Sequence, residues 1–299
     1  MKIGLIDVDG HNFPNLPLMK ISAWHKDRGD TVDWYSSLLF RNCDKVYMSK
    51  VFTNSLDYKY PVIANEVVKG GTGYNYPKGG EVLTDEIEHI YPDYSLYPQY
   101  TKDTAYGFLT RGCPRNCDFC IVSKKEGRKS VKVANLEEFW KGQKTIKLLD
   151  PNILAYKNYA ELFEQLIDSS AWIDFTQGLD IRLTTDETVK LIKRVKTKNI
   201  HFAWDNPKED LTEKFRWFKK VSGINYRKLG VYVLTNFSST HEEDLWRIYT
   251  LRDIGYNPYV MIYNKENASK KTRSLQRWVN NRIIFQTVRR FEDYNDKIG

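Results

Sequence analysis

The chain has 299 residues, of which 41% are hydrophobic and 28% are charged. This composition excludes disordered and collagen-like chains, and a chain of this length buries enough surface to fold without disulfide bonds. Lys and Arg exceed Asp and Glu by eight, which permits a nucleic-acid or acidic partner without requiring one. The longest stretch without a charged side chain, residues 229–241, is shorter than the ~20 residues that cross a bilayer, so we expect no membrane partner.

The first part of the chain alternates short apolar runs with stretches of helical spacing. Residues 2–7 form an apolar run followed by acids, which predicts a buried strand and not a signal peptide, and hence a cytoplasmic protein. Leu18, Ile21 and Trp24 fall at helical spacing. Further strands are predicted at residues 31–35, 45–48 and 66–69. Repeated β-α units predict a small parallel, Rossmann-like sheet in residues 1–92.

A tyrosine-rich segment follows this region. Residues 91–100 contain four tyrosines and two prolines and have neither a strand nor a helix period. This pattern predicts a linker or strap whose tyrosines pack across a domain boundary.

Beyond the tyrosines the alternation becomes regular. Strands are predicted at residues 105–110, 145–149, 172–175, 199–204, 231–235 and 258–263. Amphipathic helices are predicted at residues 159–168, 186–195 and 242–254. Six such repeats favour an α/β fold with a partial (β/α)6 barrel in residues 93–264, whose chemistry gathers at the carboxyl ends of its strands. Residues 265–299 are predicted to be a basic helical extension.

Three of the four cysteines lie directly after the first strand of the predicted barrel. Cys113, Cys117 and Cys120 have the spacing C-x3-C-x2-C, whereas Cys43 is distant and is interpreted as a buried thiol. Three thiols cannot pair among themselves, and short spacings let one loop hold several corners of an iron–sulfur cluster. Structural zinc needs a fourth ligand, and no second cysteine pair follows. Zinc and a simple electron-transfer cluster remain the alternatives.

This cysteine motif, with Phe119 just before Cys120, resembles the radical S-adenosylmethionine (SAM) superfamily. The resemblance covers about residues 105–263. It implies that Cys113, Cys117 and Cys120 hold a [4Fe–4S] cluster whose open iron binds SAM. It further implies reductive cleavage of SAM to a 5′-deoxyadenosyl radical, which abstracts hydrogen from a substrate not identified by the sequence. An electron donor such as flavodoxin or ferredoxin is then expected, and the backbone of Phe119 would meet the adenine.

Other SAM contacts are expected at the ends of later strands. The Gly-Gly-Glu of such families is absent, which leaves Asp150 as acceptor for the SAM amino group, with a helix N-cap as its alternative role. Gln177 is a candidate for the ribose hydroxyls. Arg182 is a candidate for the SAM carboxylate, with an ion pair to Asp180 as the alternative. Asp205 follows the next strand and is placed at the same edge.

A Rossmann-like domain before such a barrel resembles the cobalamin-binding subgroup of the superfamily, which includes methyltransferases. Asp9-Gly10-His11 stands where cobalamin domains carry D-x-H-x-x-G, and Gly70-Gly71 matches a paired-glycine turn that lines the nucleotide tail. However, Pro14 replaces the last glycine of the motif. We therefore expect a domain kept for architecture, with a cobalamin-dependent methyltransferase as the alternative.

The absence of further cysteines and the basic residues at 190–198 bear on the class of enzyme and on its partners. No cysteine follows Cys120, which argues against enzymes with a second cluster in a C-terminal extension. Five basic residues between 190 and 198 fit either a nucleic-acid partner or a solvated helix face. The alternative of another class is a non-enzymatic metal-stabilised module that binds nucleic acid through its basic face.

Overall fold

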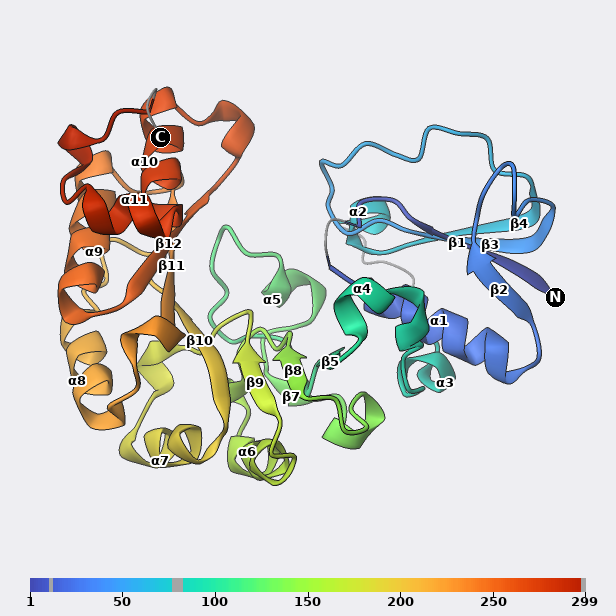
Figure 1. The fold of residues 1–299 in the computed structure, drawn as a ribbon, viewed down its shortest axis with the longest axis horizontal. Helices are drawn as coiled ribbons and strands as arrows, with labels where there is room; N and C mark the ends of the chain where they lie inside the picture. Colours follow the sequence, from blue (N-terminus) through green and yellow to red (C-terminus); the bar gives the residue numbers. More distant parts are fainter. Residues whose placement is uncertain (11–12, 77–82, 297–299) are drawn as a thin grey trace. The chain divides into compact units, whose positions relative to one another are not determined.

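The computed structural model describes residues 1–10, 13–76 and 83–296, so His11 lies outside the described residues. The protein is an α/β protein with a four-stranded and a six-stranded sheet (Figure 1). Its residues form two compact units, Met1–Gly107 with Ala134–Ile146 and Phe108–Val133 with Lys147–Gly299. The domain boundaries at residues 92 and 264 stay predictions.

The first unit contains the four-stranded sheet, in the order β2-β1-β3-β4 with every neighbouring pair parallel. The strands lie where the sequence predicts them: β1 (Lys2–Asp7), β2 (Thr31–Trp34), β3 (Cys43–Ser49) and β4 (Ala64–Gly70). Helix α1 (Leu16–Asp27) connects β1 to β2 and begins at Asn15, whose side chain accepts a hydrogen bond from the Leu18 amide. Two short helices, α2 (Thr72–Asn75) and α3 (Asp85–Glu88), follow β4.

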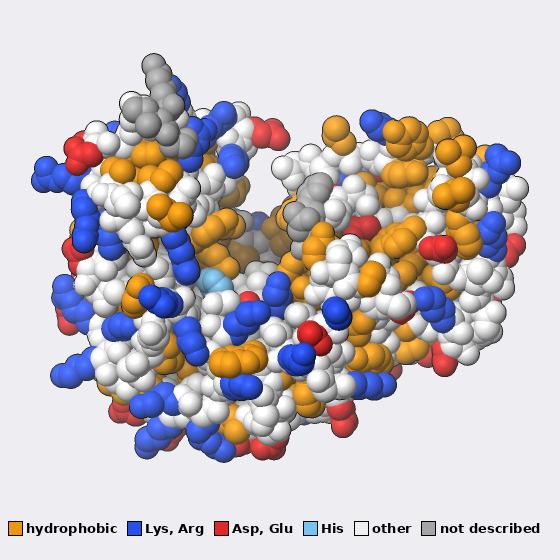
Figure 2. Space-filling view, viewed as in Figure 1, with side chains coloured by type: hydrophobic (Ala, Val, Ile, Leu, Met, Phe, Trp, Pro, Cys, Tyr) orange, Lys and Arg blue, Asp and Glu red, His pale blue; other side chains and the backbone are white. Residues whose placement is uncertain are grey.

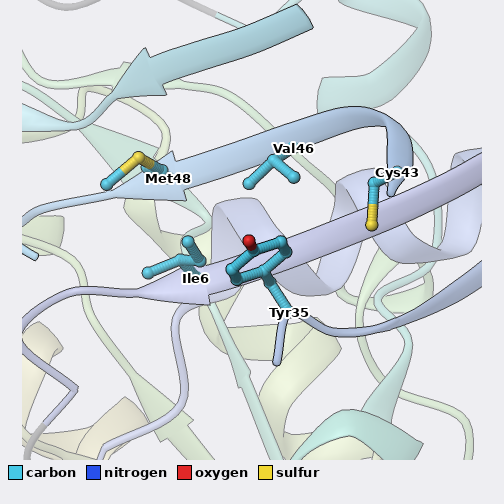
Figure 3. Close-up of a cluster of buried hydrophobic side chains, with 5 residues drawn as sticks. All are labelled: Ile6, Tyr35, Cys43, Val46 and Met48. Atoms are coloured by element: carbon cyan, nitrogen blue, oxygen red, sulfur yellow. The ribbon is translucent and has the colours of Figure 1, made fainter. Parts of the chain in front are cut away.

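A small apolar cluster packs beside this sheet (Figure 3). Its members are Ile6 of β1, Tyr35, and Cys43, Val46 and Met48 of β3. The Cys43 thiol is 98% buried among them, as the sequence predicts. Cys43 is therefore part of a hydrophobic core.

The tyrosine-rich segment belongs to the first unit, and its predicted role as a linker or strap at a domain boundary stays a prediction. It forms a short 3-10 helix (Tyr94–Leu96) and helix α4 (Pro98–Thr101). The Tyr97 hydroxyl donates to the Asp7 carboxylate (2.6 Å), and the Tyr94 hydroxyl donates to the Phe139 carbonyl (2.6 Å). These part-buried hydrogen bonds hold the segment in place.

The second sheet has the order β12-β11-β10-β9-β8-β5, and β9 to β12 pair in parallel. Its strands are β5 (Thr104–Gly107), β8 (Thr145–Leu148), β9 (Trp172–Phe175), β10 (Thr197–Ala203), β11 (Leu229–Thr235) and β12 (Asn257–Ile262). Helices α6 (Tyr159–Asp168), α7 (Asp186–Arg194), α8 (Thr212–Ser222) and α9 (His241–Ile254) follow β8, β9, β10 and β11 in turn. The parallel α/β class is confirmed, and the barrel stays a prediction.

The strand predicted at residues 105–110 is split. Strand β5 ends at Gly107, and Thr110–Arg111 forms β6, which pairs antiparallel with β7 (Val131–Lys132). The amides of Leu109 and Thr110 donate to the Asp150 side chain, which draws the chain away from a continuous strand. This split creates the base of the cysteine loop.

The described part of the C-terminal segment is helical, as predicted. Helix α10 (Lys270–Asn280) packs on the edge strand, where the Gln276 side chain donates to the Val260 carbonyl (3.0 Å). Helix α11 (Arg282–Thr287) follows it. Within the described ranges, no helix has both the length and the apolar character needed to cross a membrane.

Candidate functional site

The three clustered cysteines lie in a loop that closes on itself at β6 and β7. The Cys113 amide donates to the Gly127 carbonyl (3.1 Å). Gly112 has a φ of +84°, and a Cβ at this position would lie 2.1 Å from the Lys129 carbonyl oxygen. Only glycine fits this close approach, so the local sequence brings the two ends of the loop together.

Within the loop, Cys113, Cys117 and Cys120 are half-buried free thiols. Asn116 turns the chain with a φ of +49°, and its side chain accepts a hydrogen bond from Ser123 (3.0 Å) beside helix α5 (Val122–Lys125). Burial raises the pKa of the Cys117 thiol, and the charges of Asp205 and the other two cysteines raise it further. The three thiols and Asp205 are therefore electrostatic neighbours.

The described residues contain no preformed metal centre. In the part of the chain that the structure describes, no three His, Cys, Asp or Glu side chains are arranged to hold a metal ion. The assignment of the three cysteines as cluster ligands stays a prediction. Their common loop, partial exposure and mutual proximity are compatible with it, because a cluster needs accessible thiolates from a short segment.

Asp150 is a buried carboxylate that supports the start of the cysteine loop. Its Oδ1 accepts hydrogen bonds from the Thr110 amide (2.5 Å) and hydroxyl (2.7 Å), and its Oδ2 accepts one from the Leu109 amide (3.2 Å). Burial raises the pKa of Asp150 to about 6. It caps no described helix, because the helical segments that follow begin at Asn152 and Asn158. Its predicted contact with the SAM amino group stays a prediction.

Asn152 is a site residue that the sequence analysis missed. It is 97% buried, and its Nδ2 lies 3.7 Å from the Cys113 sulfur and 3.4 Å from Asp180 Oδ2. Its Oδ1 is buried without a hydrogen-bond partner in the described residues. Such an unpaired oxygen beside a candidate ligand cysteine suits a bound group that donates a hydrogen bond.

Arg182 lies in an ion-pair network at the end of β9. Its Nε donates to Asp180 Oδ1 (2.6 Å) and its Nη1 donates to Glu209 Oε2 (2.8 Å). Arg115, from the cysteine loop, approaches the same two carboxylates at 3.6 and 3.7 Å. The ion pair with Asp180 that the sequence left as an alternative is present. The contact of Arg182 with the SAM carboxylate stays a prediction.

The other predicted residues also follow strands of the sheet. Gln177 is exposed in the bend after β9, and no described residue pairs with it. Asp205 follows β10, and burial raises its pKa to about 6 despite the nearby Arg247 and Arg182. The Phe119 ring lies edge-on to Phe237 after β11 (5.6 Å between centroids). The carboxyl edge thus brings Asp205 close to the cysteines, and Gln177 follows β9 at the same edge, where its contact with the ribose hydroxyls stays a prediction.

The motifs compared with cobalamin domains have partners within the first unit. The Asp9 carboxylate is 97% buried and accepts hydrogen bonds from the amides of Val51 (2.8 Å) and Phe52 (2.7 Å). Gly71 has a φ of +89°, and a Cβ there would lie 2.4 Å from the Lys50 carbonyl oxygen. The chain itself therefore explains both residues, and cobalamin binding stays a prediction.

No protein-family model matches the chain, and no curated protein matches its sequence. No relative therefore assigns a function to these residues.

A separate cavity of about 600 Å³ opens in the C-terminal part of the second unit. Its lining includes His241 at the start of α9, Lys270 and Lys271 at the start of α10, and Phe291. None of the residues proposed from the sequence lines it.

Proposed function

We propose that this protein is a radical SAM enzyme that binds a [4Fe–4S] cluster through Cys113, Cys117 and Cys120. The observation that carries the proposal is the cysteine loop: three neighbouring, half-buried thiols beside the carboxyl ends of parallel strands. When bound, the cluster and SAM supply a 5′-deoxyadenosyl radical that abstracts hydrogen from the substrate. In this proposal the six-stranded sheet is a partial (β/α)6 barrel, and the four-stranded sheet is a Rossmann-like domain kept for architecture.

The chain's own residues hold the ligands and orient the bound molecule. Asn152 Oδ1, buried and unpaired beside Cys113, accepts a hydrogen bond from the SAM amino group. Asp150 keeps the first residues of the cysteine loop in place through Leu109 and Thr110. Arg115 and Asp180 connect the loop to the end of β9.

Nucleic-acid binding by the basic run receives less support. Arg194 forms a bidentate pair with Glu164 (2.5 and 2.7 Å), and the Lys196 ammonium lies 4.6 Å from the centre of the Trp172 ring. On the face drawn in Figure 2, Lys and Arg side chains are dispersed among acidic and uncharged ones. These features favour a solvated helix face.

The test is anaerobic reconstitution of the full chain with iron and sulfide, followed by SAM and dithionite. We expect about four irons per chain and formation of 5′-deoxyadenosine by the natural protein. Cys117→Ala should form none. Cys43→Ala is the matched control, because it removes the buried thiol of the first unit, and it should keep both iron and activity.

The outcomes separate the alternatives. Failure to hold iron, with one zinc per chain instead, would overturn the proposal in favour of a zinc module. A full cluster without SAM cleavage would mean either that cleavage requires the missing substrate or that the cluster only transfers electrons. Retention of added cobalamin would identify a methyltransferase, whereas we expect none to be retained.

A further inference from the structure

Strands β9 to β12 present two faces of opposite character. The face toward the helices is apolar and fully buried, with Ile173, Ile200, Phe202, Val231 and Val260. The opposite face includes the polar or aromatic residues Asp174 of β9, Asn199 and His201 of β10, Tyr232 of β11 and Tyr259 of β12, together with Met261 of β12. Tyr259 and Met261 are each 45% exposed. We call these six residues the open face.

Asp174 is the unusual member of the open face. It is 93% buried, and its Oδ2 accepts a hydrogen bond from the side-chain amide of Asn199 (3.1 Å). Its Oδ1 is buried and has no hydrogen-bond partner among the described residues. His201 Nδ1 lies 4.0 Å from Oδ1, beyond hydrogen-bond distance. A buried carboxylate oxygen without a donor is costly, so this position suits a ligand that brings one.

Neighbouring residues on β9 and β11 hold the His201 ring in place. Its Nδ1 lies 3.2 Å from the Phe175 carbonyl oxygen, which can only accept a hydrogen bond, so Nδ1 is the donor, and in that tautomer Nε2 is an acceptor. Gly230 is the cross-strand neighbour of His201, and a Cβ there would lie 2.7 Å from the ring. Tyr232 stacks on the imidazole with 5.0 Å between centroids and 11° between planes. The glycine therefore makes room for a fixed acceptor.

The aromatic rings form a row along the same face. The Tyr232 hydroxyl donates to the Thr176 carbonyl (2.8 Å), which fixes its ring. Tyr259 is the cross-strand neighbour of Tyr232, and its ring lies edge-on to it at 5.9 Å. A half-exposed tyrosine beside rings that are already ordered offers a stacking surface at low entropic cost.

We propose that the open face binds a guanine-type ring, a planar heterocycle with two adjacent N–H donors. The two donors pair with Asp174 and His201 Nε2, and the ring stacks on Tyr259. Guanine carries such an edge at N1 and its 2-amino group, whereas adenine and hypoxanthine do not present both donors. That this ring belongs to the enzyme's substrate rests on the proposed function, whereas the binding itself does not.

The experiment measures nucleoside binding by calorimetry, using the full chain without iron or SAM. Guanosine should bind at least about tenfold more tightly than inosine, which lacks the 2-amino donor. Asp174→Asn should weaken guanosine binding about tenfold or more and strengthen xanthosine binding, because the new amide donates to the 2-oxo group. Asp168→Asn, on the exposed end of α6, should change neither.

Stacking is tested separately. Tyr259→Ala should weaken guanosine binding about tenfold, whereas Tyr226→Ala, a tyrosine of similar exposure (43%) before β11, should not. A parallel titration with 5′-GMP and a short unpaired guanosine-containing RNA identifies the source of the ring, because the true source binds more tightly than the nucleoside. Equal binding of guanosine and inosine, or an unchanged preference in a folded Asp174→Asn variant, would overturn the inference. Since no iron is present, either result leaves the cluster assay independent.

Discussion

Gly112 is the residue at which the cysteine loop closes. Its φ of +84° is a backbone conformation that favours glycine, and its position against the Lys129 carbonyl leaves no space for a Cβ atom. Gly127, at the other end of the loop, has a φ of +94° but no atom within 4 Å of its Cβ position. Substituting alanine at Gly127 therefore measures the cost of the positive φ alone, whereas alanine at Gly112 adds the steric clash with Lys129.

We expect Gly112→Ala to lower the free energy of unfolding by about 3 kcal/mol or more and to lower the iron bound per chain. Gly127→Ala should cost only about 1 to 2 kcal/mol, because it incurs the backbone cost alone. Urea unfolding and iron analysis of both variants provide the measurement. Equal effects would show that the contact with Lys129 is unimportant.

Asp150 links the stability of the same region to pH. Burial raises its pKa from 3.8 to about 6, so the folded protein holds this proton more tightly than the unfolded chain. The group adds stability below its unfolded pKa of 3.8, and that stability is lost as pH rises through about 6. The hydrogen bonds from Leu109 and Thr110 oppose this shift without cancelling it.

Asp150→Asn removes the ionisable group while keeping the shape. The stability of the natural protein relative to this variant should fall by about 2.5 kcal/mol between pH 4 and pH 8. Urea unfolding at several pH values measures this difference. A difference that stays constant or grows with pH would contradict the assignment.

Among the structural elements, the strands and helices of both sheets are the part that sequence patterns predict well. Alternating or helical spacing of apolar residues predicts the ends of these elements to within a few residues. Helix α6 (Tyr159–Asp168) matches its prediction at both ends. The split of the strand at residues 105–110 escapes such patterns because its cause, Asp150, lies some forty residues later. The cysteine motif, in contrast, can be predicted from the sequence because its three cysteines lie in one short loop.

The rest of the site depends on strand order. Asn152 approaches Cys113 and Asp180 only because β8 and β9 are neighbours in the sheet. Glu209 meets Arg182 because β10 lies next to β9. Neither residue stands in a motif, and the open face likewise requires the register of four strands. Sequence alone therefore predicts the ligands better than their surroundings.

Arg247 of α9 connects the carboxyl ends of β10 and β11. Its side chain is completely buried, and it donates to the carbonyls of Trp204 (2.5 Å) and Leu234 (2.9 Å) and to Asp244 (2.5 Å). Trp204 follows β10 and Leu234 lies in β11, so one guanidinium fixes the carboxyl ends of both strands.

Arg247→Met should lower the free energy of unfolding by about 3 to 5 kcal/mol, because it leaves Asp244 and the strand-end carbonyls without their donor. Arg216→Met, which changes an exposed arginine of α8, should stay within about 0.5 kcal/mol. Urea unfolding of the two variants decides between this view and a merely space-filling role, for which methionine would cost little.

At the scale of the whole molecule, the first unit is built from two separate stretches of chain. Ala134–Ile146 belongs with Met1–Gly107, although the cysteine loop lies between them in sequence. Leu136 and Phe139 are almost fully buried, and Phe139 fills the space beside Gly107. The first unit is therefore incomplete at residue 107.

A fragment of residues 1–146 should unfold cooperatively in urea, whereas a fragment of residues 1–107 should not. The shorter fragment loses two buried side chains, each worth about 3 kcal/mol, which is a large part of the 5–15 kcal/mol typical of a domain. Circular dichroism during urea titration measures both. A cooperative transition of equal midpoint in the shorter fragment would show that residues 134–146 are dispensable.

The interleaved chain also sets the order of events on the ribosome. Residues 113–120 emerge before residues 134–146 complete the first unit, and well before β9 to β12 have been made. Throughout that interval the three thiols lack the strand ends that border them in the finished protein. The three thiols are therefore more exposed to oxidation during that interval than in the folded protein.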